Sequence, residues 1–467
     1  MENRITKVFS FVVLALLLVC CNDSKENDQF RDPNKTTEFT DFRPKQGRIR
    51  TRLYIIGENF GTDISKIKVN IGGEKAPVIG SNGKEIYCMV PRHAYNGIVE
   101  VIIYNENNQD SIKHTFDETF EYTATSSVGT LCGKVDPITG VTSIIDGPFD
   151  EVEFESPSQL LIDTNEEGET VIYVMEQKKA LRRINLAKEE VQTVFTNGQG
   201  GFRNLFTMTF NAEKDTLFLT DDHGQNNNTL PVISYALKSE NFRRVYPYVY
   251  GKTGYCAVVH PIDRQIFWGT WWDSAMWKAK GTWDEDKKIW LPIELYPTLP
   301  NKSAHMYMMM HPTGEYTYIM AHSCIMKALY DKEKQELLRP IVHVGNQFNS
   351  GYSNAPGTQA QFGGTLYQGV FVKNEEYVNA GKKDIYDFYV CDRDNHCIRI
   401  VTPDGEVRTF AGRGSPTPDG KVQGYIDGDV RKEARFDGPS GITYDEETKT
   451  FYVAEWWNRR IRTISVE

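Results

Sequence analysis

The sequence predicts an all-β protein in which a small β-sandwich precedes a six-bladed β-propeller. A sequence pattern of an apolar strand, a polar turn and a second strand recurs six times, beginning at Tyr173, Phe218, Phe267, Tyr318, Tyr389 and Tyr452. These starts are 45, 49, 51, 71 and 63 residues apart, and repeats of about that length are typical of propeller blades. The 24 Tyr and 24 Phe residues favour strands. After the N-terminus, no long stretch has helical periodicity.

Closure of the propeller is predicted from the two ends of the repeat region. The last repeat stops after its third strand, within residues 460–466, so its fourth strand is missing. Residues 128–133 precede Asp146-Gly147 in the same order in which residues 407–412 precede Asp427-Gly428. We therefore expect residues 128–133 to supply the fourth strand of the last blade, which removes an exposed edge and closes the ring.

Residues 1–20 have the pattern of a secretion signal. Arg4 and Lys7 precede an apolar run, residues 9–19, that is too short for a comfortable membrane span. Cys20 and Cys21 follow, and this arrangement resembles a bacterial lipoprotein signal, which implies lipidation at Cys21. A plain secretory signal is the alternative. The polar residues 21–37 are predicted to be a flexible tether.

Residues 38–123 form the predicted sandwich. Alternation of apolar and polar residues, as in Ile67-Lys68-Val69-Asn70-Ile71, predicts half-buried strands. The Gly-x-Asn-Phe-Gly sequence at residues 57–61 and the Ile-x-x-x-Val-Pro sequence at residues 86–91 resemble the hallmarks of the immunoglobulin-like IPT/TIG domain. In secreted bacterial proteins such domains are mostly spacers and sometimes bind carbohydrate. We expect a spacer.

Residues 124–467 carry the propeller and resemble NHL repeats. The last repeat matches best, with Ala-Arg-Phe-Asp-Gly-Pro-Ser-Gly-Ile at residues 434–442 and Asn-Arg-Arg-Ile-Arg at residues 458–462. The first repeat has the related residues 152–160. The middle repeats lack the Pro-Ser/Gly step, so their boundaries are less sharply predicted.

The ligand site is predicted on the face that holds the turns between the second and third strands of each blade, together with the loops between blades. These segments surround the channel of a propeller. All eight tryptophans fall in the third and sixth repeats, and an indole ring offers a flat apolar face on which a sugar can stack. The predicted ligand-binding residues are Trp271, Trp272, Asp273, His322, Asp222, His223, Trp456 and Trp457.

Other residues are assigned to the framework. Trp268, Trp277, Trp283 and Trp290 are expected to pack between blades. Asp221, Asp392 and Glu455 are expected to cap their own turns. Most of the scattered cysteines after Cys21 are expected to be buried small apolar residues. Cys391 and Cys397 flank one turn and are expected to be two reduced thiols, with a disulfide between them as the alternative.

The function classes are narrowed by charge and by motifs. A formal net charge of −10 disfavours a nucleic-acid partner, and no P-loop, dinucleotide fingerprint or Gly-x-Ser-x-Gly elbow occurs in a convincing context. We predict no cofactor and no metal. One alternative is a metal-dependent lyase or hydrolase that uses His223, His305 and His322. Another is a scaffold that binds an envelope protein.

The domain order resembles that of the accessory lipoproteins of Gram-negative glycan-uptake systems. The resemblance implies a protein at the outer membrane or cell surface, attached to the membrane only by its lipid anchor. It implies non-catalytic binding of an extracellular glycan, although an analogy of domain order does not by itself establish function.

Overall fold

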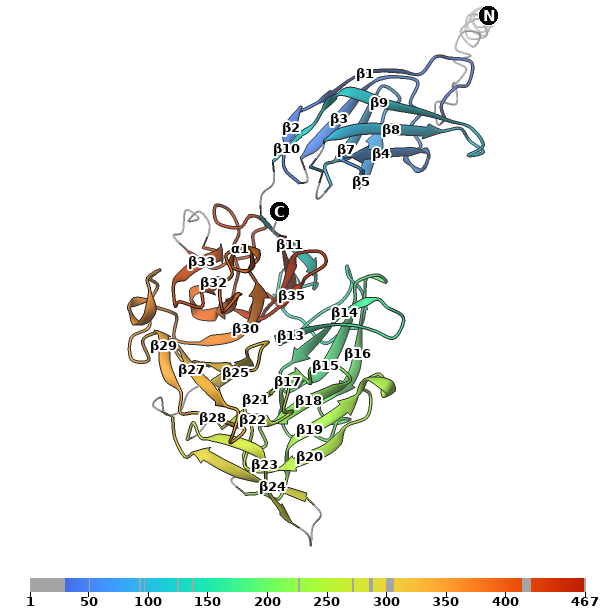
Figure 1. The fold of residues 1–467 in the computed structure, drawn as a ribbon. Helices are drawn as coiled ribbons and strands as arrows, with labels where there is room; N and C mark the ends of the chain where they lie inside the picture. The colour runs from blue at the N-terminus through green and yellow to red at the C-terminus, as the bar shows by residue number, and fades with distance from the viewer. Residues whose placement is uncertain are drawn as a thin grey trace, which may run out of the picture. The chain divides into compact units, whose positions relative to one another are not determined.

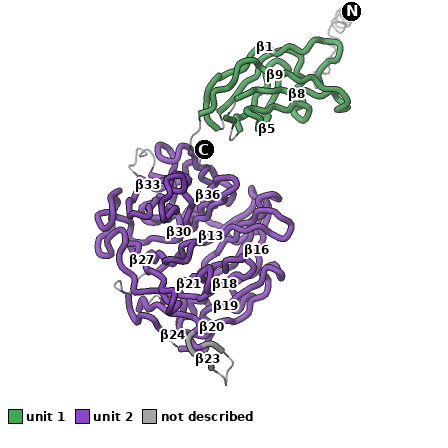
Figure 2. Tube along the Cα trace, in the orientation of Figure 1, with its two compact units in different colours: residues 1–125, 467 green, residues 126–466 purple. Residues whose placement is uncertain are grey.

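The computed structural model describes residues 30–49, 51–91, 94–95, 97–123, 126–136, 138–225, 227–270, 273–284, 289–299, 306–413 and 421–465. The chain divides into two compact units, residues 1–125 with residue 467, and residues 126–466 (Figure 2). Almost all regular structure in the described residues is β-strand, which confirms the predicted fold class.

The first unit is a sandwich of two antiparallel sheets. One sheet has the order β1 (Glu38–Arg43), β3 (Arg52–Glu58), β7 (Glu85–Met89), β6 (Val78–Ser81). The other has the order β5 (Glu74–Ala76), β4 (Ile67–Ile71), β8 (Ile98–Tyr104), β9 (Ser111–Thr119). Short β2 (Gln46–Gly47) and β10 (Glu121–Tyr122) pair in parallel. Alternate residues of β3 and β4 are buried between the sheets, as the period of a strand requires.

The Gly-x-Asn-Phe-Gly sequence ties the start of the described chain to the sandwich. Asn59 has a positive φ of 66°. Its amide donates to the backbone oxygens of Asp32 and Lys35, and its Oδ1 accepts from the Asp32 N–H. The last part of the predicted tether is therefore held against the sandwich by this side chain, together with the ion pair between Arg31 and Asp110.

The second unit contains six antiparallel sheets around a centre (Figure 1). Blade 1 comprises β13 (Pro157–Thr164), β14 (Thr170–Glu176), β15 (Ala180–Asn185) and β16 (Glu190–Thr196). Blade 2 comprises β17 (Leu205–Phe210), β18 (Thr216–Asp221), β19 (Pro231–Leu237) and β20 (Tyr246–Tyr250). Blade 3 comprises β21 (Cys256–Val259), β22 (Ile266–Gly269), β23 (Met276–Asp284) and β24 (Ile289–Tyr296). Blade 4 comprises β25 (Met306–Met310), β26 (Tyr316–Ala321), β27 (Cys324–Asp331) and β29 (Ile341–Gly345). Blade 5 comprises β30 (Leu366–Lys373), β31 (Tyr386–Asp392), β32 (Cys397–Val401) and β33 (Val407–Gly412). Blade 6 comprises β35 (Pro439–Asp445), β36 (Thr450–Glu455), β37 (Arg460–Ser465) and β11 (Ser127–Cys132). The first strands of neighbouring blades contact one another all the way round, including the sixth with the first.

Short elements extend three of these blades. The two-residue strands β12 (Gly147–Pro148), β28 (Glu336–Leu337) and β34 (Gly428–Asp429) add to blades 1, 4 and 6. One helical turn, α1 (Glu375–Asn379), lies in the turn between β30 and β31. No helix in the described part of the chain is long and apolar enough to cross a membrane.

The ring closes as the sequence predicted. β11 pairs antiparallel with β37, from Ser127 opposite Ser465 to Cys132 opposite Ile461. The chain segment that enters the propeller therefore completes the blade that ends it. Val128 is 1% exposed, so closure buries apolar surface as well as joining backbone hydrogen bonds.

The centre of the ring is filled where blades 5, 6 and 1 meet. Gln368 Oε1 accepts from the N–H groups of Leu160 and Ile442 at 2.8 and 3.1 Å, and its Nε2 donates to the Leu160 oxygen at 2.7 Å. Gly441 lies against Gln159 so closely that a Cβ at this glycine would be 2.9 Å from the Gln159 Cα. One amide side chain and one glycine thus bring β13, β30 and β35 together.

Blades 1, 5 and 6 each contain a buried ion pair that fixes the end of the second strand. In blade 6, Arg462 donates to Glu455 Oε2 at 2.8 Å, and both side chains are fully buried. The equivalent pairs are Arg182 with Glu176 in blade 1 and Arg399 with Asp392 in blade 5. Asp392 and Glu455 therefore have a structural role, as predicted, but they do not cap the backbone of their own turns: Asp392 accepts from the Gly363 N–H and Glu455 from the Asp437 N–H, both in the segment that enters the blade. Asp221 likewise accepts from the N–H groups of Arg203 and Asn204, before its blade begins.

Further framework predictions agree with the structure. Trp268 and Trp277 are buried and stack with ring centroids 6.0 Å apart, whereas the side chains of Trp283 and Trp290 lie outside the described set. Cys391 and Cys397 are buried free thiols.

Candidate ligand-binding face

The turns that carry the predicted ligand-binding residues lie at one end of the ring, where the first strands begin. We call this end the rim. The Asp222 N–H donates to the Asn204 oxygen just before β17, and the His322 oxygen accepts from the Leu366 N–H at the start of β30. The turn between the second and third strands of blade 2 is thus attached to the segment that enters blade 2 itself. The corresponding turn of blade 4 is attached to the segment that enters blade 5. The rim brings together Asp222, His223, Asp273, His322, Trp456 and Trp457.

Four residues named in the sequence analysis fall on parts of the chain that the structure does not describe. Trp271 and Trp272, which precede Asp273 in the sequence, are both outside the described residues. Cys21, the predicted lipidation site, is outside them as well, as is His305 of the metal alternative.

Trp457 presents an exposed aromatic face on the rim. Its side chain is 46% exposed. A Cβ at Gly438 would lie 2.6 Å from the indole ring, so the glycine gives this ring its place. The Arg393 guanidinium carbon is 5.2 Å from the Trp457 ring centroid and 4.6 Å from that of Tyr367. Because Arg393 also donates to Tyr367 Oη at 2.7 Å, the cation beside the indole is held in a fixed orientation.

Beneath the rim, four aromatic side chains form a continuous arc that sequence reasoning did not identify. Phe206, Tyr255, Tyr307 and Tyr367 lie at or just before the starts of β17, β21, β25 and β30. Successive ring centroids are 4.1, 5.9 and 4.8 Å apart. We call this set the aromatic arc. The available signal was an aromatic residue at the entry to four consecutive blades.

The aromatic arc links blade 1 to blade 6. At one end the Lys178 ammonium lies 5.9 Å from the Phe206 ring, and at the other end Tyr367 meets Trp456 edge to face, with centroids 6.3 Å apart. Burial raises the pKa of Tyr255 and Tyr307 well above that of free tyrosine, so both phenols stay protonated. Tyr307 Oη has no hydrogen-bond partner among the described residues.

Asp222 and His223 are held by different contacts in the rim turn of blade 2. Asp222 Oδ1 accepts from the Thr253 hydroxyl at 2.8 Å and remains partly exposed. His223 is buried, and its Nδ1 accepts from the Gln225 N–H at 3.1 Å. Burial lowers the pKa of His223 although Asp221 opposes the shift. The ring is therefore neutral at pH 7, with Nε2 as the donor.

Asp273 and His322 occupy turns of blades 3 and 4. Asp273 Oδ1 accepts from the Thr270 hydroxyl and from the Ala275 N–H, so this carboxylate caps its own turn. His322 is partly exposed and has a positive φ of 52° in a turn of two residues. The described residues contain no group of three or more His, Cys, Asp or Glu side chains placed to hold a metal ion.

This arrangement suits binding of a polar molecule that has flat faces. An indole and a guanidinium are exposed or partly exposed at blades 5 and 6, while carboxylate and imidazole groups stand on blades 2 to 4. Aromatic faces contribute contact area at little conformational cost, and the polar groups around them fix orientation.

Comparisons with known proteins agree with this organisation. Residues 38–122 match the IPT/TIG domain family. The crystal structure of an auxiliary nutrient binding protein from Bacteroides thetaiotaomicron is 35% identical with a TM-score of 0.67, over 94% of this chain and 100% of that chain. One from Bacteroides ovatus, also called an auxiliary nutrient binding protein, is 30% identical with a TM-score of 0.72 over the same shares.

A third crystal structure, from Bacteroides thetaiotaomicron and named as a candidate phosphatase, is 30% identical with a TM-score of 0.68, over 94% of this chain and 99% of that chain. Among curated proteins, none matches this chain. The identity and the coverage place the chain in the same protein family as the two Bacteroides auxiliary nutrient binding proteins.

Proposed function

We propose that this protein captures an extracellular glycan as a nutrient, on the rim of its propeller, and releases it unchanged. The observation that carries the proposal is Trp457, a half-exposed indole beside a fixed guanidinium. Two members of the family are named as nutrient binding proteins, which supports the nutrient role. The choice of a glycan rests on the chemistry of the rim.

A sugar ring has apolar C–H faces and hydroxyl groups around its edge. The Trp457 face can accept the C–H surface, while Asp394 and Arg393 beside it offer acceptors and donors for hydroxyls. Arg393 Nε donates to Asp394 Oδ1 at 3.1 Å, so these two groups are pre-oriented and lose little freedom when a ligand binds. Trp456 and the aromatic arc form the rigid base under this site.

The anchoring arrangement is part of the same proposal. We infer that Cys21 is lipidated, so that acyl chains hold the protein at the outer membrane or cell surface while the residues that follow stay in the aqueous phase. The IPT/TIG unit then acts as a spacer before the propeller. In this role it needs no ligand of its own.

The test is binding of the purified full-length mature protein to a panel of extracellular polysaccharides, followed by titration calorimetry. Trp457→Ala is expected to weaken binding of the selected glycan at least tenfold, whereas Trp457→Phe should keep part of the affinity. Tyr95→Ala is the matched control, because Tyr95 is a similarly exposed aromatic residue at 58%, in the IPT/TIG unit. Equal affinities of wild type and Trp457→Ala would show that the rim indole is not the binding platform.

A metal-dependent lyase or hydrolase is the competing hypothesis. It requires a tightly held divalent ion near His223 and His322, so metal analysis of the purified protein separates the two. A stoichiometric zinc or similar ion, together with degradation of the bound glycan, would replace capture by catalysis. Affinity for an envelope protein without affinity for any glycan would instead favour the scaffold.

A further inference from the structure

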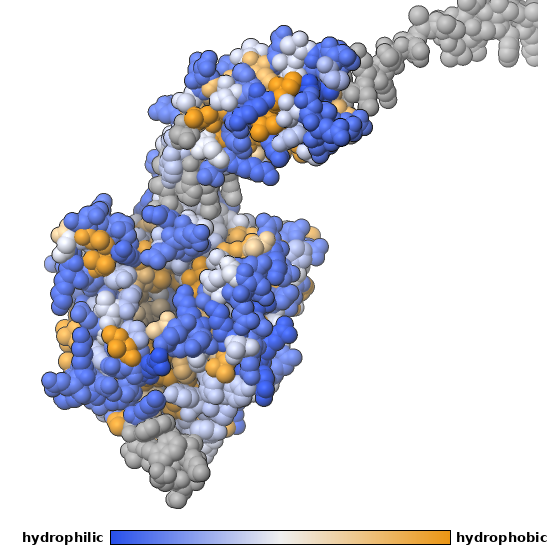
Figure 3. All heavy atoms as spheres, turned by 45° about the vertical axis from the view of Figure 1, so that its right-hand side comes forward, coloured by the Kyte–Doolittle hydropathy of each residue, from blue (hydrophilic) through white to orange (hydrophobic). Residues whose placement is uncertain are grey.

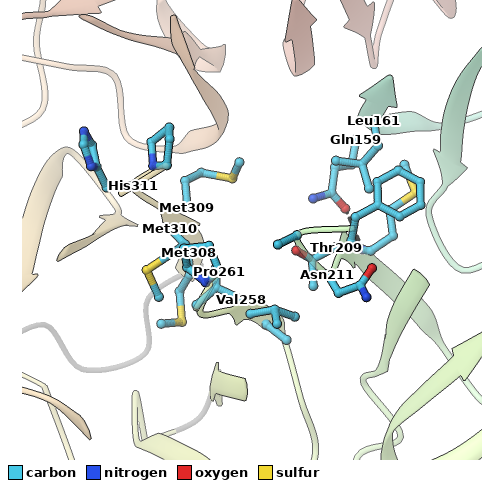
Figure 4. Close-up of a pocket in the computed structure, with 16 residues that line it drawn as sticks. Gln159, Leu161, Thr209, Asn211, Val258, Pro261, Met308, Met309, Met310 and His311 are labelled. Carbon is cyan, nitrogen blue, oxygen red and sulfur yellow. Dashed lines mark hydrogen bonds between the residues drawn. The ribbon is translucent and has the colours of Figure 1, made fainter. Parts of the chain in front are cut away.

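A hollow opens at the end of the propeller opposite the rim. Its volume is about 180 Å³. It is lined by the middle of β13, by the far ends of β17, β21 and β25, and by the turns that follow these last three strands (Figure 4). Blades 1 to 4 therefore contribute to it, whereas blades 5 and 6 do not.

The hollow exists because the ring is packed unevenly. Where blades 5, 6 and 1 meet, Gly441 and Gln368 bring the first strands into direct contact. On the other side, the side chains of β13 and β25 face each other across open space, with β17 and β21 along its wall. Figure 4 shows Met309 reaching across this space toward Gln159.

The wall of the hollow is mostly apolar and carries no lysine, arginine, aspartate or glutamate. Leu161, Val258 and three methionines, Met308, Met309 and Met310, supply much of its surface. Methionine thioethers are flexible and polarisable, so they adapt to ligands of different outline. The His311 imidazole, which also belongs to the lining, packs against Tyr316 and Phe371.

One polar group is aimed into this apolar space. Gln159 is 3% exposed, and its Oε1 accepts from the Met208 N–H at 2.7 Å. This bond fixes the amide so that Nε2, a donor, points into the hollow (Figure 4). Within the described residues, no group accepts a hydrogen bond from Nε2. This donor faces the solvent of the hollow, so a ligand that displaces that solvent must bring an acceptor or leave the donor unpaired, which is unfavourable.

We propose that this hollow is a second binding site, for a small neutral molecule or ligand group that joins one aromatic ring or short acyl chain to a carbonyl oxygen. The carbonyl oxygen accepts from Gln159 Nε2, and the apolar part lies against Met309 and Val258. A cavity of about 150 Å³ holds a benzene molecule, so the volume fits a single ring with a small substituent. The absence of a cation in the lining disfavours a carboxylate.

This site is independent of the rim, and the experiment separates the two. The probe is 4-fluoroacetophenone, with 4-fluoroethylbenzene as a matched molecule of the same shape that lacks the acceptor. Binding to the full-length protein is followed by fluorine NMR. The ketone is expected to bind about threefold to tenfold more tightly than the hydrocarbon, the range expected for one hydrogen bond.

Two variants block the hollow in different ways. Thr209→Trp fills it from the wall, and Ala212→Trp covers it from an exposed turn where a large side chain disturbs the fold least. Both are expected to abolish binding of the ketone. Gln159→Met should bring the affinities of the two probes to within a factor of two. Trp457→Ala, on the rim, should leave both unchanged.

Three results would overturn the proposal: no saturable binding of the ketone at millimolar concentration, equal affinity of the wild type for both probes, or persistence of binding in the two blocking variants. Loss of binding in Trp457→Ala would relocate the ketone to the rim. Glycan binding by Thr209→Trp provides the check that this variant is folded and that the rim still functions.

Discussion

Replacing Arg462 with methionine is expected to lower the free energy of unfolding of the propeller by about 3–5 kcal/mol. The guanidinium is fully buried and donates to Glu455 Oε2 at 2.8 Å, to the Ile426 oxygen at 3.0 Å and to the Arg435 oxygen at 3.1 Å. It also contacts Asp427. Methionine fills a similar volume but makes none of these bonds, so the loss measures the polar contacts rather than a cavity.

The magnitude follows from what remains around Glu455. The Asp437 N–H and the Asn458 amide still donate to it, but its charge has lost its buried partner. Burial already raises the pKa of Glu455 and Arg462 opposes the rise, so the variant raises that pKa further. When a glutamate has a higher pKa in the folded protein than in the unfolded chain, the folded protein is destabilised once the pH exceeds the pKa in the unfolded chain, about 4.3. The cost of Arg462→Met is therefore largest near pH 7 and decreases toward pH 4.

The assay is denaturant unfolding followed by tryptophan fluorescence, with Glu455→Gln and the double variant completing a double-mutant cycle. The loss of unfolding free energy in the double variant is expected to be smaller than the sum of the losses in the two single variants, by about 2 kcal/mol or more. Arg408→Met, at an exposed position, is the control and should change stability by less than about 0.5 kcal/mol. A loss below about 1 kcal/mol, or additive single losses, would refute the view that the pair acts as one unit.

Three further perturbations test the framework. Burial lowers the pKa of His343 to about 4, so the protein should lose at most about 3 kcal/mol as the pH falls from 6.5 to 4; His343→Phe should remove that part of the pH dependence of the unfolding midpoint. Gly441→Ala places a Cβ against backbone and should cost at least about 1–3 kcal/mol, whereas Gly198→Ala, with open space around it, should not. A chain that lacks residues 1–133 should show faster amide exchange in β37 than one that lacks residues 1–125, and similar rates would contradict closure by β11.

The sequence was sufficient for the architecture because each blade repeats a local pattern. Residues 67–71 alternate so clearly that the predicted and observed strands coincide. The order of short motifs before the first and last blades predicted the partner of β37. In both cases the information lies within a few neighbouring residues, or in a comparison of one repeat with another.

Contacts between blades were beyond the reach of the same reasoning. Nothing local marks Gln368 as a bridge to Leu160, which is 208 residues away. Asp384 lies in the long turn between β30 and β31, yet it accepts from the Tyr316 hydroxyl of the neighbouring blade at 2.9 Å. Trp457 was placed on the rim by its turn, but the burial of His223 depends on packing that a linear pattern does not record.

Both proposed sites arise from one asymmetry in the ring. Blades 1 and 6 begin their first strands with a proline and a small side chain, Ser158 and Ser440, and with Gly441 these allow close approach of the strands. Blades 2 to 5 carry the aromatic arc at the corresponding end, where its rings occupy the wider half beneath the rim. At the opposite end, the same wider half is lined by methionines instead of rings and stays partly open. Substituting a rim residue should therefore leave the hollow intact, whereas a change that separates blades 6 and 1, such as Gly441→Ala, should alter both sites together.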